Sequence, residues 1–184
     1  MVYDLIRLFE HPLYLCDYIA PAIVTLGSEG SDRCAIQVEW KRCAEDAASQ
    51  TKLTLKWDLE TIRARHPLID RQIQSLRERD DDQATKTEGA AIAAAVAVME
   101  SLEPGTRFTR KSDTGTGHDY YLNDTDDEMI EIAGRWRGKL PKLFEKKRIQ
   151  SNQNPSLRKR WVNVTIMRKD PRNRTEGLHP CPPS

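Results

Sequence analysis

The sequence predicts an α+β domain built around a central mixed sheet, and two observations lead to this prediction. Residues 36–40 and 53–57 alternate apolar and polar side chains at every second position, which is typical of half-buried strands. Residues 85–102 are instead rich in Ala and contain no helix breaker before Pro104, which predicts a buried helix packed closely on a sheet. The length of 184 residues suits a single domain.

We expect the chain to have three parts: an apolar N-terminal arm over residues 1–26, one α+β domain over residues 34–170, and a C-terminal tail over residues 171–184 whose His-Pro-Cys-Pro-Pro end is frayed. Gly and Ser punctuate the short linker between the arm and the domain. The apolar side chains of the arm form an incomplete helical stripe that Pro12 interrupts. The arm is therefore expected to pack on the main body, on a partner protein or on a second copy of the chain.

The first half of the domain is expected to hold a strand pair and a helix. Residues 43–50 connect the two alternating segments and are compatible with an antiparallel pair. Asp58 can cap a helix that runs toward Pro67, and the helical period then continues to about Arg79. This pattern predicts a helix in two pieces.

From residue 85 the predicted elements follow the order helix, three strands, helix, strand. Turn-forming residues separate the three extended runs. The second helix begins near Pro141 and carries Leu140, Leu143, Phe144 and Lys147 on one side. The ranges after the first helix are 106–110, 118–122 and 128–133 for the strands, 140–150 for the helix and 161–167 for the last strand. The αβββαβ core thus covers about residues 85–167.

The net charge of +1 hides a division along the chain. Residues 1–133 contain 15 Lys/Arg and 25 Asp/Glu, whereas residues 134–184 contain 14 and 3. A basic segment of this kind favours contact with nucleic-acid phosphates, although it can also dock on the acidic half or stay solvated. The candidate phosphate-binding residues are Arg135, Arg137, Lys139, Lys146, Lys147, Arg158, Lys159 and Arg160.

Composition excludes several other classes. No run of about 18 uncharged apolar residues exists, so no transmembrane helix is expected, and the N-terminus lacks the basic start and cleavage site of a secretory signal. The spacing of the four cysteines matches no zinc or redox motif, and the four histidines show no ligand spacing. We expect free thiols in a reducing cytoplasm, with a disulfide pair as the alternative.

The αβββαβ order resembles the common core of the PD-(D/E)XK nuclease superfamily, the restriction-endonuclease-like fold. In that family the second strand carries an acidic metal ligand, the third carries an acidic-x-Lys triplet, and the first helix often adds a Glu. The resemblance implies that Asp119, Glu131 and Glu88 take these places and that Mg²⁺ is the cofactor. Glu88 also lies at capping-box spacing from Thr85, which is its alternative role. More loosely, several runs are similar to those of small uncharacterised bacterial proteins.

The hairpin geometry supports a paired-carboxylate site. If Leu122 opposes Glu128, then Asp119 faces Glu131, and their Cβ atoms lie about 4.5 to 5.5 Å apart on one face of the sheet. Two carboxylates this close repel each other unless a cation lies between them, and their oxygen atoms suit Mg²⁺ or Mn²⁺. Such an ion can activate water and stabilise the charge that develops on a phosphate.

The sequence departs from the family pattern at two positions. His118 stands where the motif has Pro, and Ala133 stands where it has Lys. A substitute cation is needed, and among the nearby basic residues Lys142 is expected to project from the second helix.

We therefore predict a cytoplasmic bacterial nuclease that acts on DNA or RNA with Mg²⁺ and uses Asp119, Glu131 and Lys142 in catalysis. Two alternatives stay open: a non-catalytic interaction subunit, and a nucleic-acid binder without chemistry.

Overall fold

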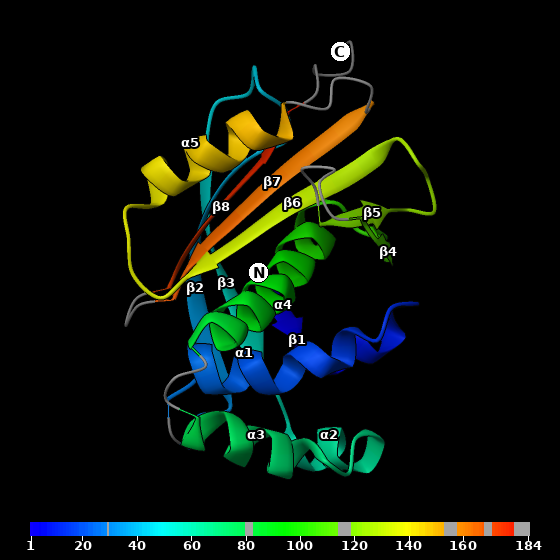
Figure 1. Ribbon diagram of the computed structural model, residues 1–184, viewed down its shortest axis with the longest axis vertical. Helices are drawn as coiled ribbons and strands as arrows, with labels where there is room; N and C mark the ends of the chain where they lie inside the picture. The colour runs from blue at the N-terminus through cyan, green and yellow to red at the C-terminus, as the bar shows by residue number, and fades with distance from the viewer. Residues whose placement is uncertain (29, 80–82, 114–118, 153–157, 168–170, 179–184) are drawn as a thin grey trace.

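The computed structural model describes residues 1–28, 30–79, 83–113, 119–152, 158–167 and 171–178. Its strands form one mixed eight-stranded sheet in the order β1-β3-β2-β8-β7-β6-β5-β4, with helices on both faces (Figure 1). The strands are β1 (Val2–Asp4), β2 (Arg33–Lys41), β3 (Ser49–Lys56), β4 (Phe108–Lys111), β5 (Tyr120–Leu122), β6 (Glu128–Arg135), β7 (Lys159–Ile166) and β8 (Arg172–Gly177). The α-helices are α1 (Ile19–Leu26), α2 (Leu59–Arg65), α3 (Ile69–Glu78), α4 (Gln83–Leu102) and α5 (Leu140–Ser151). The predicted α+β class with a central mixed sheet is confirmed.

The sheet lies between two helical layers. α4 and α1 cover one face, and α5 covers β6, β7 and β8 on the other (Figure 1). The Ala-rich middle of α4 is buried because its small side chains let the helix approach the sheet closely. Gly134 of β6 marks the closest approach, since a Cβ atom there would collide with the carbonyl oxygen of Thr87 and lie 2.7 Å from the Cβ of Ala91.

The predicted αβββαβ order is present as α4, β4, β5, β6, α5 and β7. The three strands form an antiparallel meander, and β6 then pairs with β7 in parallel. A parallel pair needs a crossover connection, and α5 provides it. β5 is shorter than expected, and His118, at the start of the predicted strand, lies outside the described residues.

The sequence predicts a C-terminal tail outside the domain from residue 171, and this is wrong for residues 172–177. These residues form β8, which lies between β2 and β7 inside the sheet. A buried set of amides and hydroxyls joins β8 to β7: the Nδ2 atom of Asn163 donates to Thr175 Oγ1 at 2.7 Å, and that of Asn173 donates to Thr165 Oγ1 at 2.7 Å. The segment has little apolar periodicity because its buried side chains are polar.

The N-terminal arm packs on the body of its own chain. β1 pairs in parallel with β3, and two short 3-10 helices (Leu5–Glu10 and Leu15–Tyr18) lead into α1. Leu5, Leu8 and Leu15 are fully buried in the main core. The apolar stripe that suggested a partner through residues 1–25 is therefore used within the chain.

The strand pair and the two-piece helix are as predicted. β2 and β3 are antiparallel, and α2 and α3 follow them as separate helices on the far side of α1 from α4 (Figure 1). Asp58 caps α2 by accepting a hydrogen bond from the backbone N–H of Glu60.

The cysteines differ from the expectation of free thiols. Cys43 is disulfide-bonded, so that expectation is wrong for this residue. Cys16 and Cys34 are free, and Cys181 lies outside the described residues. The bond removes one argument for a reducing compartment, because disulfides persist mainly in oxidising environments.

None of the helices in the described part of the chain combines the length and the apolar character that crossing a membrane requires.

Candidate functional site

Glu131 lies on the face of β6 that α5 covers, and it is almost completely buried. The register that brings Asp119 near it is the predicted one, since Tyr120 pairs with Ile130 and Tyr121 with Met129. The alternation of β6 explains the burial: Ile130 and Ile132 belong to the core with α4, so Glu131 between them must point to the opposite face.

Asp119 directly precedes β5 and binds the backbone of β6. Its Oδ2 atom accepts a hydrogen bond of 2.6 Å from the N–H of Ile132. Its own N–H donates to the carbonyl oxygen of Ile130 at 2.9 Å. These bonds fix the carboxylate beside β6, next to Glu131 in the same register.

Lys147 of α5 supplies the cation beside this pair. Its Nζ atom forms an ion pair with Glu131 and also lies 3.2 Å from the Oε1 atom of Gln150. The second helix, expected to place Lys142 at the site, thus places Lys147 beside Glu131. The signal in the sequence is the place of Lys147 on the apolar side of the helix, four residues after Leu143.

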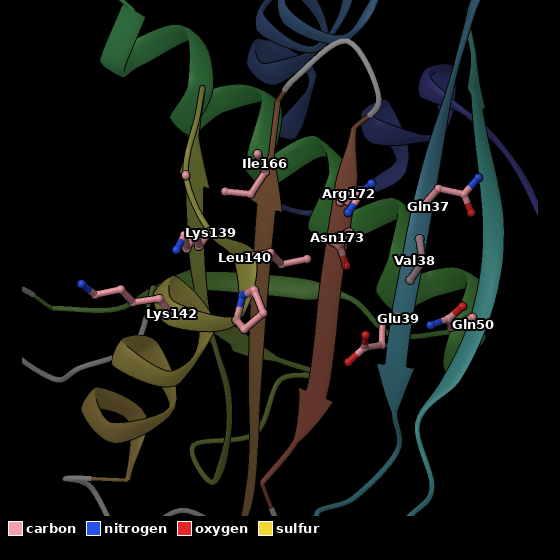
Figure 2. A pocket seen from close by; sticks show the side chains of 12 residues that line it. Gln37, Val38, Glu39, Gln50, Lys139, Leu140, Lys142, Ile166, Arg172 and Asn173 are labelled. Atoms are coloured by element: carbon pink, nitrogen blue, oxygen red, sulfur yellow. The ribbon is translucent and has the colours of Figure 1, made fainter.

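Lys142, the expected cation, is exposed and lies elsewhere. It lines a separate hollow on the open face of the sheet (Figure 2). Its position at the start of α5, more than one turn before Lys147, explains the difference.

A pocket of about 310 Å³ opens beside the carboxylates; we call it the carboxylate pocket. Asp119 and Lys147 line it together with Lys111 of β4, Arg135 of β6 and Glu88 of α4. The pocket is therefore lined by residues of both α4 and α5, and it lies beside the part of β6 that extends past the first residue of β5.

Glu88 lies on the wall of this pocket and does not cap the helix. α4 already includes Gln83, so Thr85 is not its N-cap and the capping-box interpretation is wrong. The hydroxyl of Thr87 instead donates back to the carbonyl oxygen of Gln83 at 2.8 Å. Glu88 is exposed, so its carboxylate is accessible from the pocket.

The surroundings disfavour the charged form of both carboxylates. The pKa of Glu131 is raised to about 7, first by burial and then by the charge of Asp119, while the hydrogen bond and the charge of Lys147 lower it. Burial also raises the pKa of Asp119, whereas its hydrogen bond from Ile132 and the charge of Lys147 lower it. Strongly shifted titratable groups beside a cavity are typical of functional sites.

The donor set fits a hard dication held by two protein ligands. Within the described ranges, no three His, Cys, Asp or Glu side chains are grouped closely enough to hold a metal ion. Mg²⁺, however, usually takes one or two carboxylates and completes its shell with water and substrate phosphates. Asp119 and Glu131 have oxygen atoms of this kind: Asp119 lines the pocket together with Glu88, and Glu131 is buried beside it with Lys147 as its partner.

The expected phosphate-binding residues divide into two groups. Arg135, Arg137, Lys139, Lys146 and Arg158 are exposed, and Arg135 lines the carboxylate pocket.

The remaining three form contacts within the chain. Lys147 pairs with Glu131. Lys159 forms an ion pair with Glu128 at 3.0 Å, and Arg160 donates to the carbonyl oxygen of Leu178 at 3.2 Å.

The structure thus brings together two carboxylates and one paired lysine, with exposed Arg135 on the wall of the adjacent pocket. Comparisons with protein-family models, with curated proteins and with solved structures found no match for this chain.

Proposed function

We propose that this protein is a metal-dependent nuclease that hydrolyses phosphodiester bonds at the carboxylate pocket. The observation that supports this most strongly is that Asp119 and Lys147 line a cavity that opens to solvent, with the buried Glu131 paired to Lys147 beside them. The αβββαβ order of the elements around it also agrees with the resemblance to the PD-(D/E)XK superfamily.

In this proposal Asp119 and Glu131 hold the metal ion, and Glu88 assists from the pocket wall. Bound Mg²⁺ would lower the pKa of a coordinated water and neutralise charge developing on the phosphate. Asp119 is well placed because its Oδ2 atom is fixed by Ile132, which orients the carboxylate before any ligand arrives.

Lys147 has two roles in the proposal. Without metal it balances the buried charge of Glu131, so the site folds with a cation already beside the carboxylate. With metal bound, its ammonium group is available to a phosphate oxygen at the same pocket. It thereby takes the role of the lysine that the family pattern has at position 133, whereas Lys142 lines a separate hollow.

The test is cleavage of labelled single-stranded and duplex oligonucleotides with Mg²⁺ or Mn²⁺, using wild type and the Asp119→Asn, Glu131→Gln and Lys147→Met variants. We expect each variant to lose about 10²-fold or more in rate, because metal ligands and charge-balancing groups act in the transition state. The matched control is Arg77→Met, which removes an exposed basic side chain from α3, away from the carboxylate pocket, and should keep the wild-type rate. Cleavage by Asp119→Asn and Glu131→Gln at the wild-type rate would exclude the proposal.

One observation favours a second candidate, a nucleic-acid-binding protein without chemistry. Lys147 already occupies the place of a cation beside Glu131, and a buried ion pair of this kind can serve structure alone. Under this alternative, isothermal titration would detect no Mg²⁺ binding to wild type. The protein would still bind oligonucleotides with an affinity that falls steeply with salt concentration.

A further inference from the structure

A row of side chains crosses five strands on the face of the sheet that carries α5. The register pairs Lys52 with Gln37, Gln37 with Arg172, Arg172 with Ile166, and Ile166 with Arg135. Register partners point to the same face. The row therefore runs from β3 through β2, β8 and β7 to β6 and spans about 19 Å, at about 4.8 Å per strand.

The middle of this row forms the floor of a hollow that we call the sheet groove. Its volume is about 920 Å³, and it lies between β2 and β8 and the start of α5. Figure 2 shows Gln37 and Gln50 on one side, Arg172 on β8, and Lys139 and Lys142 at the start of α5 on the other side. The groove is open because α5 covers β6 to β8 but does not reach β2 and β3.

The sheet groove carries excess positive charge. Lys139, Lys142 and Arg172 line it, and none of them forms an ion pair with a residue in the described ranges. The acidic lining residue, Glu39, is already paired with Arg174 at 3.4 Å. The charge of the groove therefore suits a polyanion.

The uncharged lining groups indicate which polyanion. Gln37 and Gln50 are exposed amides that can donate and accept hydrogen bonds, as the edges of unpaired bases require. Leu140 and Ile166 provide an apolar wall beside them. A hollow of this size accommodates a few nucleotides with unpaired bases but not the body of a duplex.

From the row, the groove and their charge, we infer that the sheet groove binds an unpaired nucleic-acid strand and leads it to the carboxylate pocket. The row ends at Arg135, which lines the carboxylate pocket, so one basic path connects the two cavities. This inference rests on the proposed nuclease function and narrows its substrate to strands with unpaired bases. Lys52 and Arg172 bind phosphates along the path, and Gln37 contacts bases between them.

The experiment measures binding in EDTA, where no metal-dependent cleavage occurs, by fluorescence anisotropy of a labelled single-stranded oligonucleotide over a series of salt concentrations. Wild type should bind the single strand more tightly than the duplex of the same sequence. Arg172→Glu and Lys52→Glu should each weaken binding by roughly tenfold and reduce the slope of log K against log salt by about 0.7, as expected for one lost phosphate contact to a single strand.

The matched control is Arg77→Glu, which makes the same charge change at an exposed position of α3, outside the helical layer that holds α5. It should leave binding within twofold of wild type, and circular dichroism should show all three variants folded. The inference is overturned if Arg172→Glu and Lys52→Glu bind like the control, or if the duplex binds more tightly. Competition by a polyglutamate peptide as effective as by the oligonucleotide would also overturn it, because the occupant would then be an acidic polypeptide.

The two proposals fail in different ways. Oligonucleotide binding that depends on Arg172, without any Mg²⁺-dependent cleavage, would exclude the nuclease function and support strand binding in the sheet groove. Cleavage that depends on Asp119 but not on Arg172 or Lys52 would support the nuclease function and exclude strand binding in the groove.

Discussion

Two buried carboxylates in this protein have the same kind of partner and different surroundings. Glu100, in the last turns of α4, lies 2.5 Å from His11 Nε2 and also forms an ion pair with Arg7. Glu131, on β6, forms its ion pair with Lys147. Both carboxylate side chains are less than a tenth exposed, and each has a cationic partner.

The difference lies in what else reaches each carboxylate. The partners of Glu100 come from the N-terminal arm, and the His11 side chain is only 3% exposed, so this cluster closes the arm over the core. Glu131 instead has a second carboxylate beside it and a pocket next to its lysine. We conclude that the Glu100 cluster stabilises the fold, whereas the Glu131 cluster is retained despite an electrostatic cost. Such a cost is common at sites where function needs an unfavourable arrangement.

The largest expected difference between the two clusters is in the free energy of unfolding when each glutamate is substituted. Glu100→Ala should lower the free energy of unfolding by about 3 kcal/mol, because it leaves buried His11 without its acceptor. Glu131→Gln should change it by less than about 1 kcal/mol at neutral pH, because the amide removes the repulsion from Asp119. Urea unfolding of both variants in EDTA measures the difference. Equal losses would show that the Glu131 cluster is as structural as the other.

A second test of the difference between the two clusters uses the contact between α4 and β6. The helix α4 carries Glu100 near its end, and its Thr87 and Ala91 line the carboxylate pocket. Gly134→Ala should destabilise the protein by about 2 kcal/mol, because the new methyl group meets the carbonyl oxygen of Thr87 and the side chain of Ala91. The control is Gly105→Ala, whose added Cβ meets nothing within 4 Å, so any cost there comes from its positive φ alone. Thermal unfolding and Mg²⁺ titration should both report the change, since Thr87 and Ala91 line the carboxylate pocket. An unchanged metal affinity would mean that this wall does not position the ligands.

The elements with a strong apolar periodicity could be predicted from the sequence. An element that is held in place by side-chain hydrogen bonds could not. The Ala-rich α4 and the alternating β2 and β3 have patterns that burial enforces. β8 has the pattern Asn-x-Thr on its buried face, where hydrogen bonds to Asn163 and Thr165 replace apolar contacts. Such bonds depend on a neighbouring strand that the local sequence does not reveal.

The site divides in the same way. The Asp119–Glu131 register follows from one hairpin and could be derived locally. The lysine that pairs with Glu131 could not be derived locally, because the position of α5 over the sheet decides which of its lysines reaches this carboxylate. Lys142 and Lys147 lie on the same helix, but only Lys147 contacts Glu131.

The last expected effect is a pH dependence of stability that comes from Glu131. The pKa of Glu131 is raised from 4.5 to about 7 in the folded protein, so the folded state holds this proton more strongly than the unfolded state. Between these two pH values the folded state binds more protons, and stability must therefore fall as pH rises from about 4.5 to about 7. Glu131→Gln lacks this titration. Each pKa unit corresponds to about 1.4 kcal/mol, so relative to that variant wild type should lose up to about 3 kcal/mol across the window, measured by urea unfolding in EDTA. A difference that stays constant with pH would mean that Lys147 keeps Glu131 ionised throughout, and the strain assigned to this carboxylate would be absent.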